Sequence, residues 1–393
     1  MNPTTVLMSG ALSVAALLIP TSAAFGQSVV DPPRVIMTTV AQDTAFRVVQ
    51  LVSGLDHPWS FAFMPDGRIL ITERPGRLFL YGAGDTNNRL GMLEIVGLPR
   101  VAVNGQGGLF DVILHPDYEH SGWIYLTYSS RYGLGHGTTL SRARLQGNEL
   151  VDLHELFRMS GPTLSGRHFG SRLAFGIDGK LYMTVGERGS RNRAQDLADH
   201  AGSVIRLNDD GSIPFDNPFV GREGVLPEIY SYGHRNPQGI ALNPWSGEVW
   251  LHEHGPRGGD EINIVRPALN YGWPVVSYGH EYATDRQVGE GTSKPGIVEP
   301  VLHWTPSIAP SGMTFYDGDA FEPWYGDIFA GALAGEHLRR VDLEGDEVIG
   351  QEILLQGVVG RIRDVRTGPD GFLYLITDED HGGLYRLEPV PLR

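Results

Sequence analysis

A short pattern recurs along the chain: an apolar strand, a turn rich in Pro, Asp and Gly, and a second apolar strand. The clearest copy spans residues 59–72, where the turn is Pro65-Asp66-Gly67. An Asp-Gly pair between runs of alternating apolar residues is a strong short-range signal for a β-hairpin. The pattern therefore predicts a hairpin at each copy. The further copies lie at residues 108–127, 172–184, 239–251, 312–331 and 362–377.

The spacing of the six copies predicts a repeat architecture. Successive copies begin roughly 50–70 residues apart, close to the period of propeller blades that carry inserted loops. Propellers protect their sheet edges by radial repetition, and helical signals are sparse here. We therefore expect an all-β, six-bladed β-propeller with four-stranded antiparallel blades, against a β-sandwich pair or a β-helix. A strand at residues 46–52 is expected to complete the last blade and close the ring.

The start of the chain has the pattern of an export signal. Residues 6–19 form an apolar run too short to span a bilayer with ordinary margins, and small residues follow at 22–24. We expect a signal peptide over residues 1–26, an extension over 27–44, a propeller domain over 45–393, and a periplasmic or secreted location. Residues 1–5 hold no Lys or Arg, which leaves a disordered or anchored N-terminus as the alternative. No later segment is apolar enough to cross a membrane.

Composition narrows the function classes. At 393 residues the chain exceeds the ~250–300 residues at which single cores stop growing, which agrees with a repeat fold. The net charge of −15 argues against nucleic-acid binding, because an acidic chain repels phosphate backbones. The chain has no cysteine, so its fold does not rely on disulfides.

Three loops beside the hairpins carry residues that the repeat does not explain. Gln106 stands among glycines at 104–108, where backbone can approach a ligand closely. His168 precedes the third hairpin, and a pKa near neutrality suits a general base. Arg235 and Asn236 precede the fourth hairpin and suit carboxylate or quinone oxygens. Taken singly, a tight turn, a structural histidine or a surface ion pair would explain each.

Two further segments add metal-binding and anion-binding chemistry. Residues 252–263 crowd carboxylates and backbone carbonyls beside glycines, the hard oxygen ligands that Ca²⁺ prefers. His252 and His254 share one face of a strand, so a zinc site is the alternative. Arg361 and Arg363 also share a face and would repel each other without an anion or an acid such as Asp364. In a propeller these loops gather at one end of the central channel, where we expect the site.

These segments resemble the family of soluble PQQ-dependent glucose/sorbosone dehydrogenases, and most of all its bacterial aldose sugar dehydrogenases. The resemblance covers about residues 51–387, and its most specific pieces are SYGHRNPQG (231–239), EHGPRGGDEIN (253–263) and RIRDVRTGPDG (361–371). It implies oxidation of aldose sugars at C1 to lactones, dependent on pyrroloquinoline quinone (PQQ) and Ca²⁺. Hydride would pass to PQQ, and electrons to an external acceptor such as a quinone, a cytochrome or a dye. The protein would be a monomer or a homodimer.

The resemblance also implies roles for individual residues. His168 matches the proton acceptor, and Arg235 the group that stabilises the developing negative oxygen. Residues that match or adjoin cofactor contacts are Gln106, Arg167, His168, Arg235, Asn236, Arg361 and Arg363. The backbone carbonyls of Gly255 and Pro256 match ligands of the PQQ-bound Ca²⁺, whereas Glu261 and Tyr271 match ligands of a second, structural Ca²⁺.

The sequence departs from the family pattern at two positions. Arg167 stands where the glucose dehydrogenases have an Asp before the catalytic His, and Ala334 stands where the family has a PQQ-binding Lys. Arg339 or Arg167 would be the substitute cation. The competing predictions are a calcium-dependent lactonase or other hydrolase on a propeller, and a periplasmic binding propeller that has lost its cofactor.

Overall fold

A computed structural model of the chain describes residues 1, 28–29, 31–82 and 91–391. Within them lie 26 β-strands, one α-helix of four residues, α1 (Tyr118–Ser121), and two 3₁₀ helices, η1 (Arg191–Gln195) and η2 (Glu322–Trp324). The expected export signal over residues 1–26 falls almost wholly outside the described residues. No helix in the described part of the chain is long and apolar enough to cross a bilayer.

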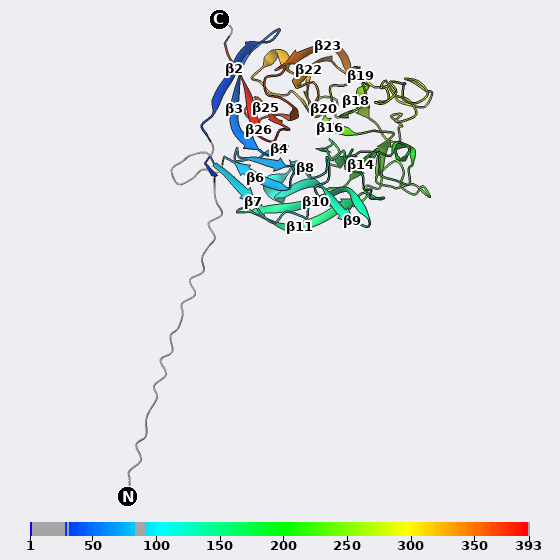
Figure 1. Ribbon diagram of the computed structural model, residues 1–393, viewed down its shortest axis with the longest axis horizontal. Coiled ribbons are helices and arrows are strands. Elements are labelled where there is room, and N and C mark those ends of the chain that lie inside the picture. The colour runs from blue at the N-terminus through cyan, green and yellow to red at the C-terminus, as the bar shows by residue number, and fades with distance from the viewer. Residues whose placement is uncertain (2–27, 30, 83–90, 392–393) are drawn as a thin grey trace.

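The strands form six antiparallel sheets arranged as blades around a common centre (Figure 1). The all-β, six-bladed prediction is thus confirmed, and every expected hairpin is the inner strand pair of one blade. Four blades have four strands, and the first and last blades carry a fifth strand at the outer edge.

From the inner to the outer edge, the first three blades are β4 (Pro58–Phe63), β5 (Ile69–Glu73), β6 (Arg77–Tyr81), β7 (Gly91–Ile95), β1 (Ser28–Val29); β8 (Leu109–Leu114), β9 (Trp123–Tyr132), β10 (Gly135–Gln146), β11 (Glu149–Arg158); and β12 (Leu173–Phe175), β13 (Leu181–Val185), β14 (Ser203–Leu207), β15 (Ile229–Tyr232). The last three are β16 (Pro237–Leu242), β17 (Val249–Glu253), β18 (Asp260–Val265), β19 (Leu302–Trp304); β20 (Pro310–Phe315), β21 (Ile328–Ala332), β22 (His337–Glu344), β23 (Glu347–Leu354); and β24 (Ile362–Thr367), β25 (Leu373–Thr377), β26 (Gly382–Pro389), β3 (Ala45–Leu55), β2 (Arg34–Val40).

The two ends of the chain close the ring. Strand β3 pairs antiparallel with β26, with Val52 opposite Leu384 and Val48 opposite Leu387, so the N-terminal strand completes the last blade as expected. Figure 1 shows the blue β3 beside the red strands of the C-terminal blade. Strand β2 then pairs with β3 and adds the outermost strand.

Apolar side chains pack between neighbouring blades. Leu70 and Leu80 of the first blade meet Leu109 and Leu126 of the second in one fully buried cluster. Burying a leucine is worth about 1.5–3 kcal/mol, so each blade is held mainly by the next one around the ring. The inner strands β4, β8, β12, β16, β20 and β24 contact one another in turn around the channel.

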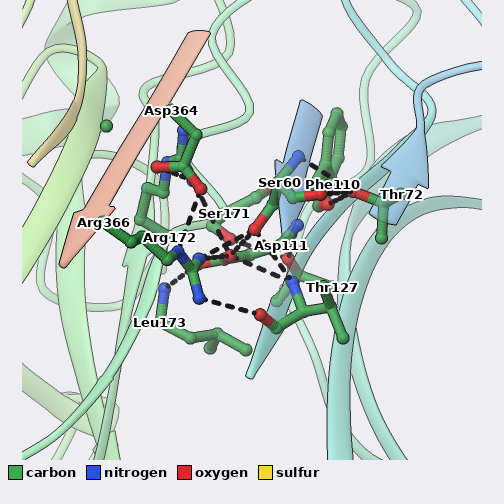
Figure 2. Close-up of polar contacts among 12 residues, drawn as sticks. Ser60, Thr72, Phe110, Asp111, Thr127, Ser171, Arg172, Leu173, Asp364 and Arg366 are labelled. Carbon is green, nitrogen blue, oxygen red and sulfur yellow. Dashed lines mark hydrogen bonds and ion pairs between the residues drawn. The ribbon is translucent and has the colours of Figure 1, made fainter. Parts of the chain in front are cut away.

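A buried network of charged side chains links the inner strands around the channel (Figure 2). Asp111 on β8 accepts hydrogen bonds from Ser60 Oγ at 2.5 Å and Arg366 Nη2 at 2.6 Å. Arg172 Nη1 lies 3.0 Å from Asp364 Oδ1. Two guanidiniums thus balance two carboxylates, which offsets the cost of burying them, and the network joins β4, β8 and β24 with the residue that precedes β12.

The same network supports the end of the channel where the inner strands begin. Arg172 donates from Nε to the Gln238 carbonyl at 2.8 Å and from Nη2 to the Arg363 carbonyl at 2.8 Å. Both acceptors lie at the start of an inner strand. The loops that lead into the six inner strands therefore meet on one face of the propeller, over a rigid base.

Candidate active site

Two adjoining cavities occupy that face. The inner cavity, of about 440 Å³, lies over the channel, and the outer cavity, of about 680 Å³, lies beside it under the loops around residues 255–258 and 280–285. Residues lining both are Gln106, Asn236, His254, Ala309 and Ala334. The predicted loops of residues 104–108, 167–172, 232–239, 252–263 and 360–365 all reach this face.

The floor of the inner cavity is aromatic. Trp59, Phe110 and Phe169 form a buried cluster, with ring centroids 5.3 Å apart for the first pair and 5.4 Å for the second. They come from β4, from β8 and from the loop before β12. The rings are tilted by 55° and 45° from one another, so such a floor presents aromatic faces and edges that can pack against a planar ligand.

His168 is held by two hydrogen bonds beside the outer cavity. Its backbone N–H donates to Gln106 Oε1 at 2.8 Å, and its ring Nδ1 lies 2.8 Å from Glu187 Oε1. Its φ of 57° is uncommon for a residue other than glycine. Surrounding contacts must therefore fix this backbone, as is frequent at functional positions.

The surroundings keep the imidazole neutral. Burial lowers the pKa of His168 below its ordinary value, although the hydrogen bond to Glu187 opposes this, and the charges of Arg235 and Arg167 lower it further. Burial alone would raise the pKa of Glu187, but its contacts with His168 and the charge of Arg235 bring it below the ordinary value. Because Nδ1–H donates to an ionised carboxylate, Nε2 carries the lone pair and can accept a proton.

Arg235 and Asn236 lie side by side at the start of the fourth blade. The Arg235 N–H donates to Glu253 Oε2 at 2.5 Å, and Nη1 donates to the Gly255 carbonyl at 2.8 Å. The Arg235 Nε is buried and has no hydrogen-bond partner among the described residues. Asn236 Oδ1 accepts from the Gly170 N–H at 3.3 Å. The pair thus presents a cation and an amide to the outer cavity.

Three arginines form one wall of the inner cavity: Arg74, Arg361 and Arg363. Arg361 Nη1 donates to the Leu333 carbonyl at 3.1 Å, and Arg363 forms a close ion pair with Asp378. Burial would raise the pKa of Asp378, but the charges of Arg363, Arg74 and Arg361 hold it below its ordinary value. Three cations against one carboxylate leave this wall positively charged.

The predicted calcium carbonyls line the outer cavity. The Gly255 carbonyl accepts from Arg235, as described above, and the Pro256 carbonyl accepts from the Tyr282 hydroxyl at 2.8 Å. Asp260 fixes this loop, because its carboxylate accepts the Gly255 N–H at 2.8 Å and the Ile308 N–H at 2.7 Å. Both carbonyl oxygens thus accept hydrogen bonds from side chains that also line the outer cavity, on a turn anchored by Asp260.

The two histidines of this segment have other partners. His252 Nε2 bonds to the Gly312 carbonyl at 3.0 Å, and His254 Nε2 bonds to the Pro310 carbonyl at 2.8 Å. Burial lowers the pKa of His252 to about 4. No group of three or more His, Asp or Glu side chains among the described residues is placed to hold a metal ion, so the zinc alternative finds no support.

Glu261 and Tyr271 lie together behind the outer cavity, next to Glu253. Burial and the neighbouring Glu253 raise the pKa of Glu261 to about 8. The Tyr271 hydroxyl donates to the Ile264 carbonyl at 2.5 Å and accepts from the Arg266 N–H at 2.8 Å, so its backbone carbonyl is the better placed atom to offer to a cation. A cation bound beside this buried carboxylate would stabilise its ionised form.

Comparison with known proteins decides the family. Residues 55–386 match the family described as Glucose / Sorbosone dehydrogenase. The chain belongs to that family. It is 43% identical over 354 residues to the aldose sugar dehydrogenase of Escherichia coli, covering 89% of this chain and 94% of the relative. It is 28% identical over 422 residues to quinoprotein glucose dehydrogenase B of Acinetobacter calcoaceticus, covering 86% of each chain.

Solved structures agree. The Escherichia coli aldose sugar dehydrogenase in its apo form is similar with a TM-score of 0.84, at 43% identity, covering 88% of this chain and 100% of the other. The PQQ-bound form of an aldose sugar dehydrogenase from Streptomyces coelicolor is similar with a TM-score of 0.69, at 27% identity, covering 91% and 98%. This member of the glucose/sorbosone dehydrogenase family is therefore a sugar-oxidising oxidoreductase, which confirms the predicted family and enzyme class.

The two departures from the family pattern have different surroundings. Ala334 lines both cavities, so no lysine reaches them from this position. Arg167 is exposed and lines neither cavity, and Arg339 lies on β22, away from both. Neither of the two expected substitutes adds a cation to the cavity walls.

Four residues of this candidate site were not predicted individually: Arg74, Glu187, Asp378 and Asp260, of which Asp260 lies in the predicted segment 252–263. Arg74, Glu187 and Asp378 share a position, just beyond the second strand of a predicted hairpin. That strand returns to the face from which the first strand leaves, so a polar residue at this point was the signal available.

Proposed function

We propose that this protein oxidises aldose sugars at C1 to lactones, using PQQ held in the inner cavity with Ca²⁺, and passes the electrons to an external acceptor. The observation that carries the proposal is the positively charged arginine wall above an aromatic floor, next to a neutral histidine. The PQQ-bound relative supports it. We also propose a periplasmic or secreted location, on the pattern of the first 26 residues.

The residues present fit PQQ, a flat aromatic molecule with three carboxylates. The floor of Trp59, Phe110 and Phe169 suits its rings. The Nε atoms of Arg74 and Arg363 are buried and have no hydrogen-bond partner among the described residues, as expected of donors that await an anion. Residues that would hold the cofactor are Gln106, Asn236, Arg361 and Arg363. PQQ, when bound, supplies a quinone that accepts a hydride equivalent.

Calcium fits the oxygen atoms at the back of the site. The Gly255 and Pro256 carbonyls are hard ligands of the type that Ca²⁺ selects, and Ca²⁺ supplies Lewis acidity there. Glu261 and the Tyr271 carbonyl would hold a second, structural Ca²⁺. Arg167 does not line the cavities, so its contribution would be electrostatic.

The chain's own residues would handle the proton and the charge. His168 Nε2 accepts the proton of the C1 hydroxyl, which the neutral imidazole can do at physiological pH. Glu187, at 2.8 Å from Nδ1, fixes the ring and stabilises the imidazolium that forms. Arg235 stabilises the negative charge that develops on oxygen, because this cation lines the outer cavity beside His168.

Reconstitution tests the proposal. Purified apoprotein is assayed for dye-linked oxidation of an aldose panel, with PQQ and Ca²⁺ added singly and together, and activity is expected only when both are present. His168→Ala should retain the PQQ absorbance after gel filtration and lose oxidation by about 10²–10⁴-fold. Absence of activity with every aldose, together with no retained PQQ, would instead favour the lactonase or the cofactor-free binding propeller.

A further inference from the structure

Arg74 is a cation of the inner cavity that neither the repeat nor the family resemblance indicates. It follows β5 directly, and its Nη1 donates to the Gly105 carbonyl at 2.8 Å. Its Nε is buried and has no hydrogen-bond partner among the described residues. The guanidinium is thus anchored through Nη1 on a residue that lines the inner cavity.

The backbone of Arg74 is fixed as firmly as its side chain. Its N–H donates to the His57 carbonyl at 3.0 Å, and its carbonyl accepts the Leu109 N–H at 2.9 Å. A Cβ at Gly108 would overlap the Arg74 carbonyl oxygen. The glycine at 108 therefore allows the loop of Gln106 to pack directly on Arg74, which keeps the guanidinium in the cavity wall.

The other two arginines of the wall already have partners in the protein, which leaves Arg74 as a further cation for a ligand. Arg363 already shares its charge with Asp378 through a close ion pair, and Arg361 donates to the Leu333 carbonyl. Ala334 adds no charge, and Arg167 and Arg339 lie outside both cavities. Within the inner cavity, a ligand with three carboxylates thus meets three arginines only if Arg74 takes part.

We propose that Arg74 binds a carboxylate of the cofactor and supplies the third cation of the inner cavity, where Ala334 supplies none. This inference rests on the proposed function, because it takes PQQ as the ligand. Arg74 would hold the anion through charge-assisted hydrogen bonds, which are stronger than neutral ones. Its second contact, to Gly105, would keep the loop of Gln106 in register with the bound ligand.

Binding affinity measures this directly, without turnover. PQQ and its uncharged trimethyl ester are titrated into apoprotein at fixed Ca²⁺, and Kd is read from quenching of tryptophan fluorescence, since Trp59 lines the cavity. Arg74→Gln should weaken PQQ binding by about 10- to 100-fold, the range for losing one hydrogen bond to a charged group. The same variant should leave ester binding close to wild type. Arg74→Lys should restore most of the affinity for PQQ.

Two arginine variants serve as matched controls. Arg339→Gln and Arg77→Gln each remove one positive charge outside the cavities and should leave the Kd of PQQ unchanged. Arg74→Met, which keeps a long apolar stem against Gly108, replaces Arg74→Gln if that variant does not fold by circular dichroism.

The outcomes separate the inference from the proposed function. If the wild-type protein binds no PQQ, the proposed function itself is wrong. Wild-type binding with no loss in Arg74→Gln would overturn the inference alone. An equal loss for PQQ and its trimethyl ester would also overturn it, because the effect would then come from loop packing and not from charge.

Discussion

The His168–Glu187 pair shows how the fold sets the chemistry of single residues. Burial disfavours the charged imidazole, and the carboxylate at 2.8 Å partly compensates. The balance leaves a neutral ring with a fixed tautomer, as a general base requires. Both groups lie in loops and depend on neighbours from other blades. The neutral form of His168 and the ionised form of Glu187 could therefore not be predicted from the local sequence.

Changing Glu187 to Gln should shift the pH dependence of sugar oxidation. The pKa of His168 lies below its ordinary value of 6.5, so kcat/KM should rise with pH through a midpoint below 6.5 and then level off. Glu187 raises that pKa, so Glu187→Gln should move the acidic limb to lower pH. The plateau should also fall, because the imidazolium loses its carboxylate, by up to the roughly 10²–10⁴-fold that general-base catalysis contributes.

The pH–rate profile of reconstituted enzyme measures both effects. Glu228→Gln is the matched control, since Glu228 lies 3.6 Å from His200 in a second Glu–His pair outside the site. A limb that moves to higher pH in Glu187→Gln would contradict the assigned role.

At the scale of elements, the sequence predicted the inner hairpins correctly, because their turns and alternation are local. Residues 59–72 became β4 and β5, and residues 362–377 became β24 and β25. The fifth strands β1 and β2 were not foreseen. The second strands of the hairpins are followed directly by site residues, such as Arg74 after β5 and Asp378 after β25. Their roles escaped prediction because a role depends on which blades become neighbours after closure.

Gly108→Ala tests the packing between two such elements. The new Cβ would overlap the Arg74 carbonyl, so the loop of residues 104–108 must move away from β5. We expect the free energy of unfolding to fall by about 1–3 kcal/mol, the usual cost of overpacking, and PQQ affinity to fall with it. Denaturant unfolding and PQQ titration measure the two effects.

Gly350→Ala provides the comparison for that variant. Gly350 lies in β23, and its added Cβ would meet Asp342 only at 3.4 Å, an ordinary contact. Its stability should stay close to wild type. Equal stability of both alanine variants would show that Gly108 is not sterically required.

At the scale of the molecule, the site is a product of ring closure. The inner cavity takes Trp59 from the first blade, Phe110 from the second and Arg363 from the last, which meet only when β3 pairs with β26. The channel network beneath them joins the same blades through Asp111, Arg172 and Arg366 (Figure 2). Stability and site geometry are therefore coupled, and a ligand that binds the closed ring should stabilise all of it.

Calcium should show this coupling in a pH-dependent way. Without a cation, the folded-state pKa of Glu261 is raised from 4.5 to about 8, so the stability linked to this group is complete below pH 4.5 and is lost as pH rises through 8. Ca²⁺ reverses the trend, because its ligands must be deprotonated. The rise in melting temperature with Ca²⁺, measured without PQQ, should therefore be larger at pH 8.5 than at pH 6. The stabilisation behind this rise is about 2.7 kcal/mol when free Ca²⁺ exceeds Kd by 100-fold.

Glu261→Gln should abolish the difference between the two pH values. Glu248→Gln, at a partly exposed ion pair with Arg266, should leave it unchanged. A calcium effect that is equal at both pH values would remove Glu261 from the cation site.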